Sequence, residues 1–248
     1  MTIRFYGSQR NILERLVNKW LPDGPPVAIL QGFPGCGKTQ LARNVATHAP
    51  RSLDPVEPQM DSGDPVVDLF LELAITLEAH GLPNLVQEID KGDKARLDKA
   101  LLNILRHEQI LIVVDEFQRL FPKEKNTPPQ VWAKLIEDLN NSPHAQGRLL
   151  LVSNRVIKTE RWSENCQVEE VQGLPDQEAE SLFTELLESQ GLEAAVSPER
   201  RREVVHRLGG NPRALKTLVV GLRIDTLDDL LSAAPDLWKP GDVALDPK

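Results

Sequence analysis

Short runs of apolar residues alternate along the chain with longer stretches in which apolar residues recur every three or four positions. The runs predict strands at residues 27–30, 109–114 and 149–152, and a short last strand at residues 168–171. Apolar runs of this length are typical of strands that are buried on both faces of a parallel sheet. Their alternation with helical stretches predicts an α/β domain.

The helical stretches in this part of the chain have recognisable start signals. Ser8 is a good N-cap for a first helix, and Asp64 followed by Pro65 opens another. Further helices are predicted at residues 39–48, 93–107 and 128–139. A short strand around Val56 stays an open interpretation, because prolines interrupt the pattern there.

The pattern changes at Pro175, beyond which only helical spacing remains. Helices are predicted at about residues 176–189, 198–208, 212–222 and 226–233. We therefore predict an α/β domain at residues 1–172 and a small all-helical lid domain at residues 173–235. Residues 236–248 are predicted to be a C-terminal tail or linker.

The composition excludes several classes of protein. The chain has 248 residues and a formal net charge of −8, which argues against nucleic acid as a partner. Two cysteines and five scattered histidines give neither a disulfide framework nor a zinc-binding pattern. The sequence also lacks an apolar stretch long enough to span a membrane and the apolar run of a signal peptide, so a cytoplasmic location is expected.

A glycine-rich segment follows the first predicted strand and precedes a predicted helix. Residues 32–39 match the phosphate-loop pattern GxxxxGK[ST] at every fixed position. Glycines let successive backbone N–H groups curl around a phosphate, and the positive end of the following helix points at the same anion. Lys38 is expected to reach the β- and γ-phosphates, and the Thr39 hydroxyl is expected to bind Mg²⁺. The predicted nucleotide-binding residues here are Gly32, Pro34, Gly35, Cys36, Gly37, Lys38, Thr39 and Gln40.

Polar residues follow the next two predicted strands. Asp115 is placed to hold the Mg²⁺ of a bound nucleotide, and Glu116 is placed to polarise an attacking water. Asn154 and Arg155 follow the strand at residues 149–152, where a polar or cationic group would face the γ-phosphate. The alternative is that these residues are solvated groups in ordinary strand-end turns.

With these three elements in this order, the chain resembles a P-loop NTPase of the additional-strand-Glu kind, the group that includes AAA+ ATPases and STAND ATPases (signal transduction ATPases with numerous domains). Residues 151–155 (Leu-Val-Ser-Asn-Arg) resemble the NB-ARC strand that ends in Thr-Thr-Arg, which implies that Arg155 is the γ-phosphate sensor. Residues 5–10 resemble the entry segment that packs near adenine, with Ser8 and Gln9 in place of the usual Arg and Glu. This resemblance implies adenine contacts from Tyr6 and Gly7.

The predicted helical part adds to the resemblance to STAND proteins. Residues 173–183 are similar to the segment that opens the helical domain in that family. Residues 209–215 (Gly-Gly-Asn-Pro-Arg-Ala-Leu) closely resemble its GxP motif, whose proline packs on the adenine, and this implies an adenine contact from Pro212. The alternative is an ordinary corner between two helices.

The resemblance implies a three-layer P-loop NTPase sheet with a lid, ATP or ADP as ligand and Mg²⁺ as cofactor. It also implies a regulatory switch in which ADP keeps the lid closed and ATP permits homo-oligomerisation. Hydrolysis would be slow, with Glu116, Lys38 and Arg155 as catalytic residues. STAND relatives usually carry a winged helix, sensor repeats and an effector domain, so we expect effector and sensor domains outside this chain.

Two other functions stay open. An AAA+-like ATPase machine or loader that acts on DNA or protein would show robust turnover and a trans-acting arginine finger, for which Arg119, Arg155 and Arg161 are candidates. A P-loop relic would bind ADP without hydrolysing ATP. The sequence has no NKxD guanine motif, which favours adenine nucleotides. The arginines at residues 200–202 are interpreted as a solvated helix face rather than as a phosphate contact.

Overall fold

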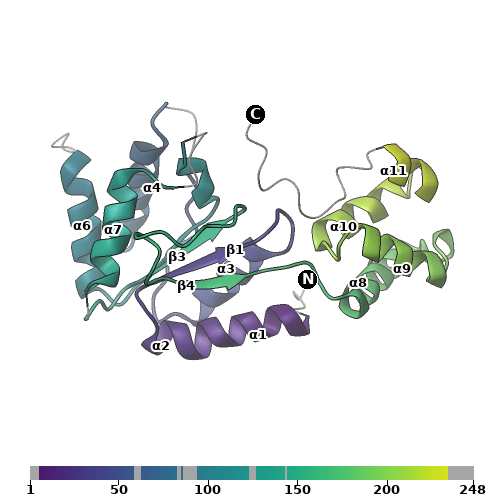
Figure 1. Ribbon diagram of the computed structural model, residues 1–248, viewed down its shortest axis with the longest axis horizontal. Coiled ribbons are helices and arrows are strands. Elements are labelled where there is room, and N and C mark those ends of the chain that lie inside the picture. Colours follow the sequence, from purple (N-terminus) through teal and green to yellow (C-terminus); the bar gives the residue numbers. More distant parts are fainter. Residues whose placement is uncertain are drawn as a thin grey trace. The chain divides into compact units, whose positions relative to one another are not determined.

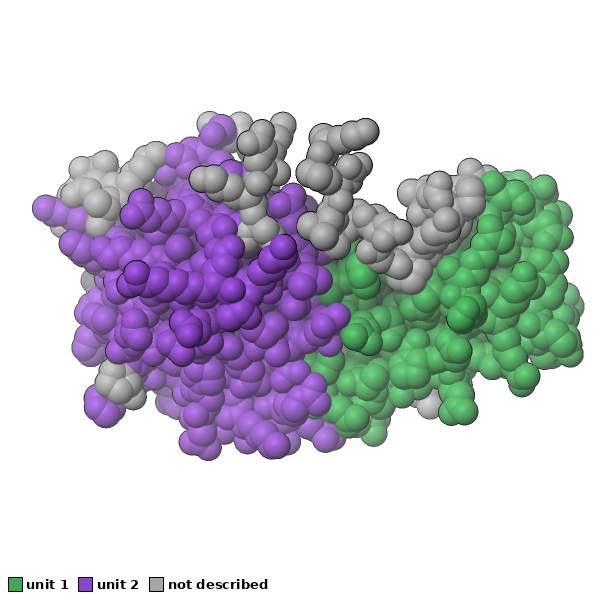
Figure 2. Space-filling model, viewed as in Figure 1, with its two compact units in different colours: residues 1–12, 32–37, 171–248 green, residues 13–31, 38–170 purple. Residues whose placement is uncertain are grey.

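The computed structural model describes residues 6–58, 63–82, 85, 94–122, 127–142 and 144–233. Its contacts divide the chain into two compact units, which Figure 2 shows in different colours. The first, called the sheet unit below, comprises residues 13–31 and 38–170. The second, called the helical unit, comprises residues 1–12, 32–37 and 171–248.

Four parallel strands form the sheet of the sheet unit (Figure 1). They are β1 (Val27–Gln31), β2 (Leu111–Val114), β3 (Arg148–Ser153) and β4 (Gln167–Glu170), in the order β2-β3-β1-β4. β1 pairs with both β3 and β4, and β2 pairs with β3. Every residue of β1 and β2 is buried, so the predicted parallel sheet of doubly buried strands is confirmed.

The segment around Val56 runs beside β2 without forming a full strand. Isolated parallel bridges join Ser52 to Leu111 and Val56 to Val114. The sequence left open whether a short strand lies at this position, and the structure shows two single bridges there.

The helices that precede β4 in the chain largely follow the predicted stretches. Helix α1 (Gly7–Arg15), whose residues 7–12 belong to the helical unit, continues through a π-helical turn (Leu16–Trp20) into α2 (Leu21–Asp23), and α3 (Lys38–His48) follows the glycine-rich loop. The others are α4 (Pro65–Ala79), α6 (Lys94–His107) and α7 (Gln130–Asn140), with a 3₁₀ turn at Phe117–Leu120. Asp64 caps α4 as predicted, since its carboxylate accepts hydrogen bonds from the N–H groups of Val66 and Val67. No helix in the described ranges combines the length and the apolar character that a membrane span requires.

An aromatic cluster in the core lies directly behind the end of β2. The ring of Phe117 makes an edge contact with Trp132, with 5.7 Å between ring centroids, and Trp132 stacks on Phe70 at 5.4 Å. Trp162 is also buried, so both tryptophans serve packing. The cluster fixes Phe117, and it thereby fixes the backbone that follows Asp115 and Glu116.

Trp20 and Trp132 form a matched pair for a stability test. Both are fully buried, but the indole N–H of Trp20 donates to the carbonyl of Pro25 at 2.8 Å, whereas that of Trp132 has no acceptor in the described part of the chain. A buried donor without an acceptor costs about 1–3 kcal/mol, and Trp132→Phe removes that cost while Trp20→Phe breaks a bond. We expect Trp20→Phe to lower the free energy of unfolding by at least about 1 kcal/mol more than Trp132→Phe in urea titrations. Equal losses would contradict this account of the two sites.

The helical unit contains the four helices that the sequence predicts after Pro175. They are α8 (Asp176–Ser189), α9 (Pro198–Arg207), α10 (Pro212–Gly221) and α11 (Leu227–Ala233), with a 3₁₀ turn at Glu193–Ala195. Their apolar faces meet in one core that includes Phe183, Leu187, Val204, Leu215 and Leu218. Ser197 and Asn211 cap α9 and α10, and a proline occupies the first turn of each helix.

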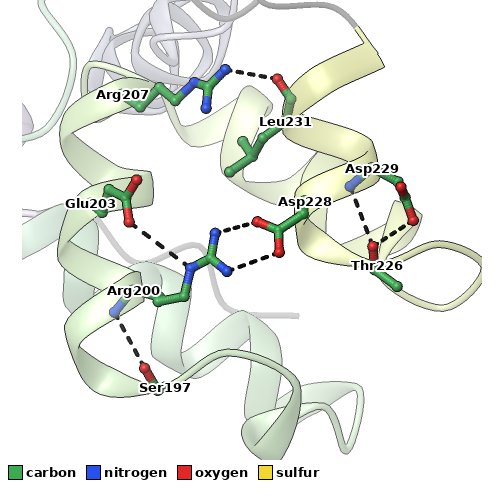
Figure 3. A network of polar contacts seen from close by, with 8 residues as sticks. All are labelled: Ser197, Arg200, Glu203, Arg207, Thr226, Asp228, Asp229 and Leu231. Atoms are coloured by element: carbon green, nitrogen blue, oxygen red, sulfur yellow. Dashed lines mark hydrogen bonds and ion pairs between the residues drawn. The ribbon is translucent and has the colours of Figure 1, made fainter.

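Polar contacts fasten α11 to α9 (Figure 3). The guanidinium of Arg200 pairs with both carboxylate oxygens of Asp228, at 2.5 and 3.2 Å, and this pairing holds the pKa of Asp228 below its usual range. Arg207 donates to the carbonyl of Leu231 at 2.8 Å, near the carboxyl end of α11. Arg201 and Arg202 also have partners within the helical unit. The arginines at residues 200–202 therefore join helices to one another, which refines their interpretation as a solvated face.

The grouping of residues differs in one respect from the predicted division. The sequence places all of residues 1–172 in one α/β domain, whereas the contacts group residues 1–12 and 32–37 with the helical part. The predicted tail at residues 236–248 lies outside the described residues.

Candidate functional site

Three strand ends and one helix start bring polar residues to one edge of the sheet unit. β1 ends at Gln31, β2 is followed by Asp115, β3 ends at Ser153, and α3 begins at Lys38. The carboxyl ends of parallel strands lie at the same edge, which is the usual ligand-binding edge of an open α/β sheet. All four polar residues are buried. Buried polar groups that converge in this way mark the edge as a candidate functional site.

Asp115 is held rigidly at the end of β2. Its N–H donates to the carbonyl of Val56 at 2.8 Å, and one of its carboxylate oxygens accepts the N–H of Glu116 at 2.8 Å. The carboxylate is almost fully buried, with 3% of the residue exposed. The two single bridges of the segment near Val56 therefore help to position this carboxylate.

Glu116 has an unusual backbone conformation. Its φ of 49° lies in the left-handed region, and no other non-glycine residue in the described ranges has a positive φ. Such strain costs about 1–3 kcal/mol and tends to occur at functional sites. Asp115 and Glu116 thus lie at a strained turn between the buried end of β2 and the aromatic cluster behind Phe117.

The carboxylate of Glu116 accepts two short hydrogen bonds from side-chain amides. Asn154 donates to Oε1 at 2.5 Å, and Gln118 donates to Oε2 at 2.6 Å. The guanidinium Nε of Arg119 lies 3.6 Å from Oε2. The structure therefore places the amide of Asn154, predicted to face a phosphate, on Glu116.

The loop after β3 is tied both to itself and to the end of β1. The hydroxyl of Ser153 donates to the carbonyl of Arg155 at 2.9 Å and accepts the N–H of Arg155 at 3.0 Å. The side-chain oxygen of Gln31 accepts the N–H of Ile157 at 2.8 Å. These bonds fix the backbone at Arg155, whose predicted role as a phosphate sensor stays a prediction.

The phosphate loop, residues 32–37, belongs to the helical unit and is hydrogen-bonded to two of its segments. The side-chain amide of Asn211 donates to the carbonyl of Pro34 at 2.8 Å, and the N–H of Arg213 donates to the carbonyl of Gly35 at 3.3 Å. The amide of Gln9, in α1, donates to the carbonyl of Cys36 at 2.8 Å. Three consecutive carbonyls of the loop are thus bonded to α1 and to the start of α10.

Gly35 makes the close approach of α10 possible. Its φ is +86°, and a Cβ at this position would lie 2.6 Å from the Cβ of Arg213 and 2.7 Å from the side-chain oxygen of Asn211. Any side chain larger than hydrogen would separate the loop from the helix.

The entry segment is bonded to α8 within the same unit. The hydroxyl of Ser8 donates to the carboxylate of Glu178 at 3.0 Å, and the hydroxyl of Tyr6 lies 3.4 Å from that of Glu185. Pro212 occupies the first turn of α10, behind the Asn211 cap. The helical unit therefore contains Tyr6, the adjoining Gly7, Pro212 and the glycine-rich loop, whereas Lys38, Thr39 and Gln40 form the first turn of α3 in the sheet unit.

Three residues of the site were missed in the sequence. Gln9 and Arg213 contact the phosphate loop, and Gln118 contacts Glu116. Arg213 carried a usable signal, because it directly follows the Gly-Asn-Pro segment at a helix start. Gln9 lies within the segment that resembles the family's entry segment, whereas Gln118 carried no signal, since a glutamine next to a motif is ordinarily a surface residue.

The model of the AAA domain family matches residues 23–159, which is more than half of the chain. A comparison with curated proteins finds no match. The sequence thus relates the chain to a family model, and structural comparison extends the likeness to its fold.

Three solved structures illustrate this likeness. A Walker-type ATPase of Pyrococcus abyssi superposes with a TM-score of 0.61 at 15% identity, over 87% of this chain and 67% of that one. Domain III of the replication initiation protein DnaA from Thermotoga maritima gives 0.54 at 16% identity, over 95% of each chain. A STAND protein with a tetratricopeptide repeat sensor from Pyrococcus horikoshii gives 0.56 at 16% identity, over 97% of this chain but 34% of that protein. At such low identity these likenesses show a shared fold.

Proposed function

Since the chain belongs to the AAA domain family, we propose that it is an ATP- and ADP-binding regulatory switch of the STAND type, with slow ATP hydrolysis. Membership confirms the coarser expectation from the sequence, a nucleotide-binding ATPase domain with a P-loop fold. The switch itself is supported by one observation above all. Within the helical unit, the phosphate loop and the start of α10 are joined by hydrogen bonds.

Phosphate binding is assigned to the motif at residues 32–39. Its loop offers backbone N–H groups to the phosphates, and α3 directs the positive end of its dipole to the same place. Lys38 is 4% exposed at the start of α3, directly after the loop. Its ammonium group is assigned to the β- and γ-phosphates.

Mg²⁺ is assigned to Thr39 and Asp115. In the described ranges no three His, Cys, Asp or Glu side chains gather into a metal-binding group. Mg²⁺ at nucleotide sites is typically held by one or two protein oxygens together with phosphate oxygens, so one hydroxyl and one buried carboxylate fit its needs. When bound, the ion would neutralise charge on the phosphates.

Hydrolysis is assigned to Glu116, Lys38 and Arg155. Glu116 orients the attacking water, while the two cations stabilise the charge that develops on the phosphates. The adenine contacts are assigned to Tyr6, Gly7 and Pro212. The adenine contacts and the role of Arg155 follow the resemblance stated for the sequence. The fixed position of the turn at Asp115 and Glu116 supports the role of Glu116.

The switching step is assigned to the bonds between the loop and α10. Nucleotide phosphates bind the N–H groups of the loop, and its carbonyls at Pro34 and Gly35 bond Asn211 and Arg213. A γ-phosphate that reorients the loop must therefore change these bonds, which is a known way of switching an ordered segment. Exchange of ADP for ATP would in this way permit association of copies and signal to effector and sensor domains outside this chain.

A substitution at Asn211 separates its two roles. Its side-chain oxygen caps α10 by accepting the N–H groups of Arg213 and Ala214, and its amide donates to Pro34. Asn211→Asp keeps the cap and replaces the donor by an oxygen, so we expect thermal stability to fall by roughly one net hydrogen bond and a fluorescent ADP to be released about tenfold faster. Ser197→Asp, at the cap of α9, is the matched control. A folded Asn211→Asp variant that releases ADP at the original rate would count against the switching step.

A second candidate function is an AAA+-like machine or loader that acts on DNA. Domain III of DnaA, a replication initiation protein, matches this chain over 95% of both chains, which favours this candidate. The net charge of −8 weighs against it. Stimulation of ATP hydrolysis by added duplex or single-stranded DNA would favour the DNA-acting candidate over the regulatory switch.

A further inference from the structure

The side chains of Asn154 and Gln118 close a ring of hydrogen bonds with Glu116 in the sheet unit. Asn154 donates to one carboxylate oxygen at 2.5 Å, and Gln118 donates to the other at 2.6 Å. The side-chain oxygen of Gln118 in turn accepts the backbone N–H of Asn154 at 2.9 Å. Gln118 is thus the link that joins the carboxylate to the backbone at the end of β3.

We infer that Gln118 is a positioning residue that restrains Glu116 and keeps hydrolysis slow. This inference rests on the proposed function, because it gives the ATPase site a built-in restraint. Gln118 itself has no assigned contact with nucleotide or metal. It acts through Glu116, and its effect should appear in turnover rather than in nucleotide affinity.

The restraint follows from the bonding of the carboxylate. During hydrolysis a bond forms between the water oxygen and the γ-phosphorus, and the bond to the β-phosphate oxygen breaks with its electron pair remaining on ADP. One proton of the water passes to Glu116. Each carboxylate oxygen of Glu116 already accepts a short hydrogen bond from an amide, so an attacking water must share an oxygen with that amide or displace it.

The ring also fixes where the carboxylate lies. A general base must come within about 2.6–3.2 Å of the group whose proton it takes. The left-handed backbone at Glu116, the ring and the guanidinium of Arg119 at 3.6 Å together hold the side chain in one place. Reaching a water elsewhere requires breaking the bond to Gln118, the bond to Asn154, or both.

Gln118 can be tested apart from the nucleotide-binding residues. Asn154 is predicted from the sequence to face the γ-phosphate, so replacing it would alter binding and the restraint together. Gln118 follows the buried Phe117, which fixes its backbone in the core, while its own side chain is half-buried. Gln118→Met keeps the length of the side chain and removes both the donor and the acceptor. The matched control is Gln146→Met, at an exposed glutamine of the same unit.

The experiment measures steady-state ATP hydrolysis and the affinity for a fluorescent ATP analogue in the full chain. We expect Gln118→Met to raise kcat about three- to tenfold, with the KM for ATP and the analogue affinity unchanged, since each tenfold in rate is about 1.4 kcal/mol of barrier. Gln146→Met should behave as the unmodified chain. The increase should disappear in a double variant that also carries Glu116→Gln.

Each outcome of this experiment supports or overturns the inference about Gln118 or the proposed function. Normal nucleotide binding with an unchanged or lower kcat in Gln118→Met overturns the inference, and a lower kcat would mean that the ring assists catalysis. The inference is also overturned if the unmodified chain and Gln118→Met both bind nucleotide and neither hydrolyses ATP. Release of Glu116 from Gln118 would then produce no turnover. A chain that stays folded and binds neither ATP nor ADP would instead refute the proposed function. Thermal unfolding of Gln118→Met identifies a folding defect, and Gln118→Leu then repeats the measurement.

Discussion

The Lys38→Ala variant is expected to bind ATP and ADP about 100-fold more weakly than the unmodified chain. Lys38 is the buried cation at the start of α3, and the phosphate loop precedes it directly. Removing one partner of a buried, hydrogen-bonded charge pair costs about 2–5 kcal/mol, and about 1.4 kcal/mol corresponds to a tenfold change in affinity. Titration of a fluorescent nucleotide, in the presence of Mg²⁺, measures the effect.

Lys99→Ala is the matched control for this variant, because Lys99 is an exposed lysine of α6 in the same unit. It should bind both nucleotides as the unmodified chain does. Unchanged nucleotide affinity in a folded Lys38→Ala variant would remove the basis for assigning phosphate binding to residues 32–39.

The Glu116→Gln variant is expected to keep nucleotide affinity and to lose ATP turnover by roughly 100-fold or more. General base catalysis contributes about 10²–10⁴ to a rate, and an amide cannot accept the proton of the attacking water. Binding should persist, because the phosphate loop and Lys38 are assigned that role. Single-turnover release of phosphate and nucleotide titration measure the two quantities separately.

The ring around Glu116 predicts a secondary effect of the same substitution. A glutamine at this position offers one oxygen where the ring supplies two donors, from Asn154 and Gln118. One of these amides must then turn or lose its partner, so a small loss of stability should accompany the loss of turnover. Glu78→Gln, at an exposed position of α4, serves as the control and should change neither quantity. Turnover that survives in Glu116→Gln would assign the water-orienting role to another group.

Local patterns in the sequence predict much of the fold. The apolar runs give the strands because the central strands are buried on both faces, and the cap at Asp64 is visible as a single residue. The strand predicted to begin at residue 109 begins at Leu111 instead. The N–H of Ile110 bonds back to Glu108, and the N–H of Leu111 pairs with Arg51. A pattern of apolar residues in the sequence does not predict these backbone hydrogen-bond partners, which decide where the strand begins.

The features of the candidate site also fall into those that the sequence predicts and those that it does not. Residues 32–39 and Asp115 are predictable, because their chemistry depends on neighbours in the sequence and on a strand end. The bond between Asn154 and Glu116 joins residues 38 positions apart, and that between Asn211 and Pro34 joins residues 177 positions apart. Such contacts depend on side-chain rotamers and on how closely separate segments approach each other. The spacing of residues in the sequence predicts neither. For the same reason the grouping of the phosphate loop with the helical unit emerges only from the structure.

The most direct test of the account is a calorimetric titration of the unmodified chain with ADP and with ATP in the presence of Mg²⁺. We predict saturable binding of one molecule of either nucleotide per chain, abolished or greatly weakened in Lys38→Ala. A folded chain that binds neither nucleotide would contradict the assignment of the phosphate loop, and with it the proposal of a nucleotide-operated switch.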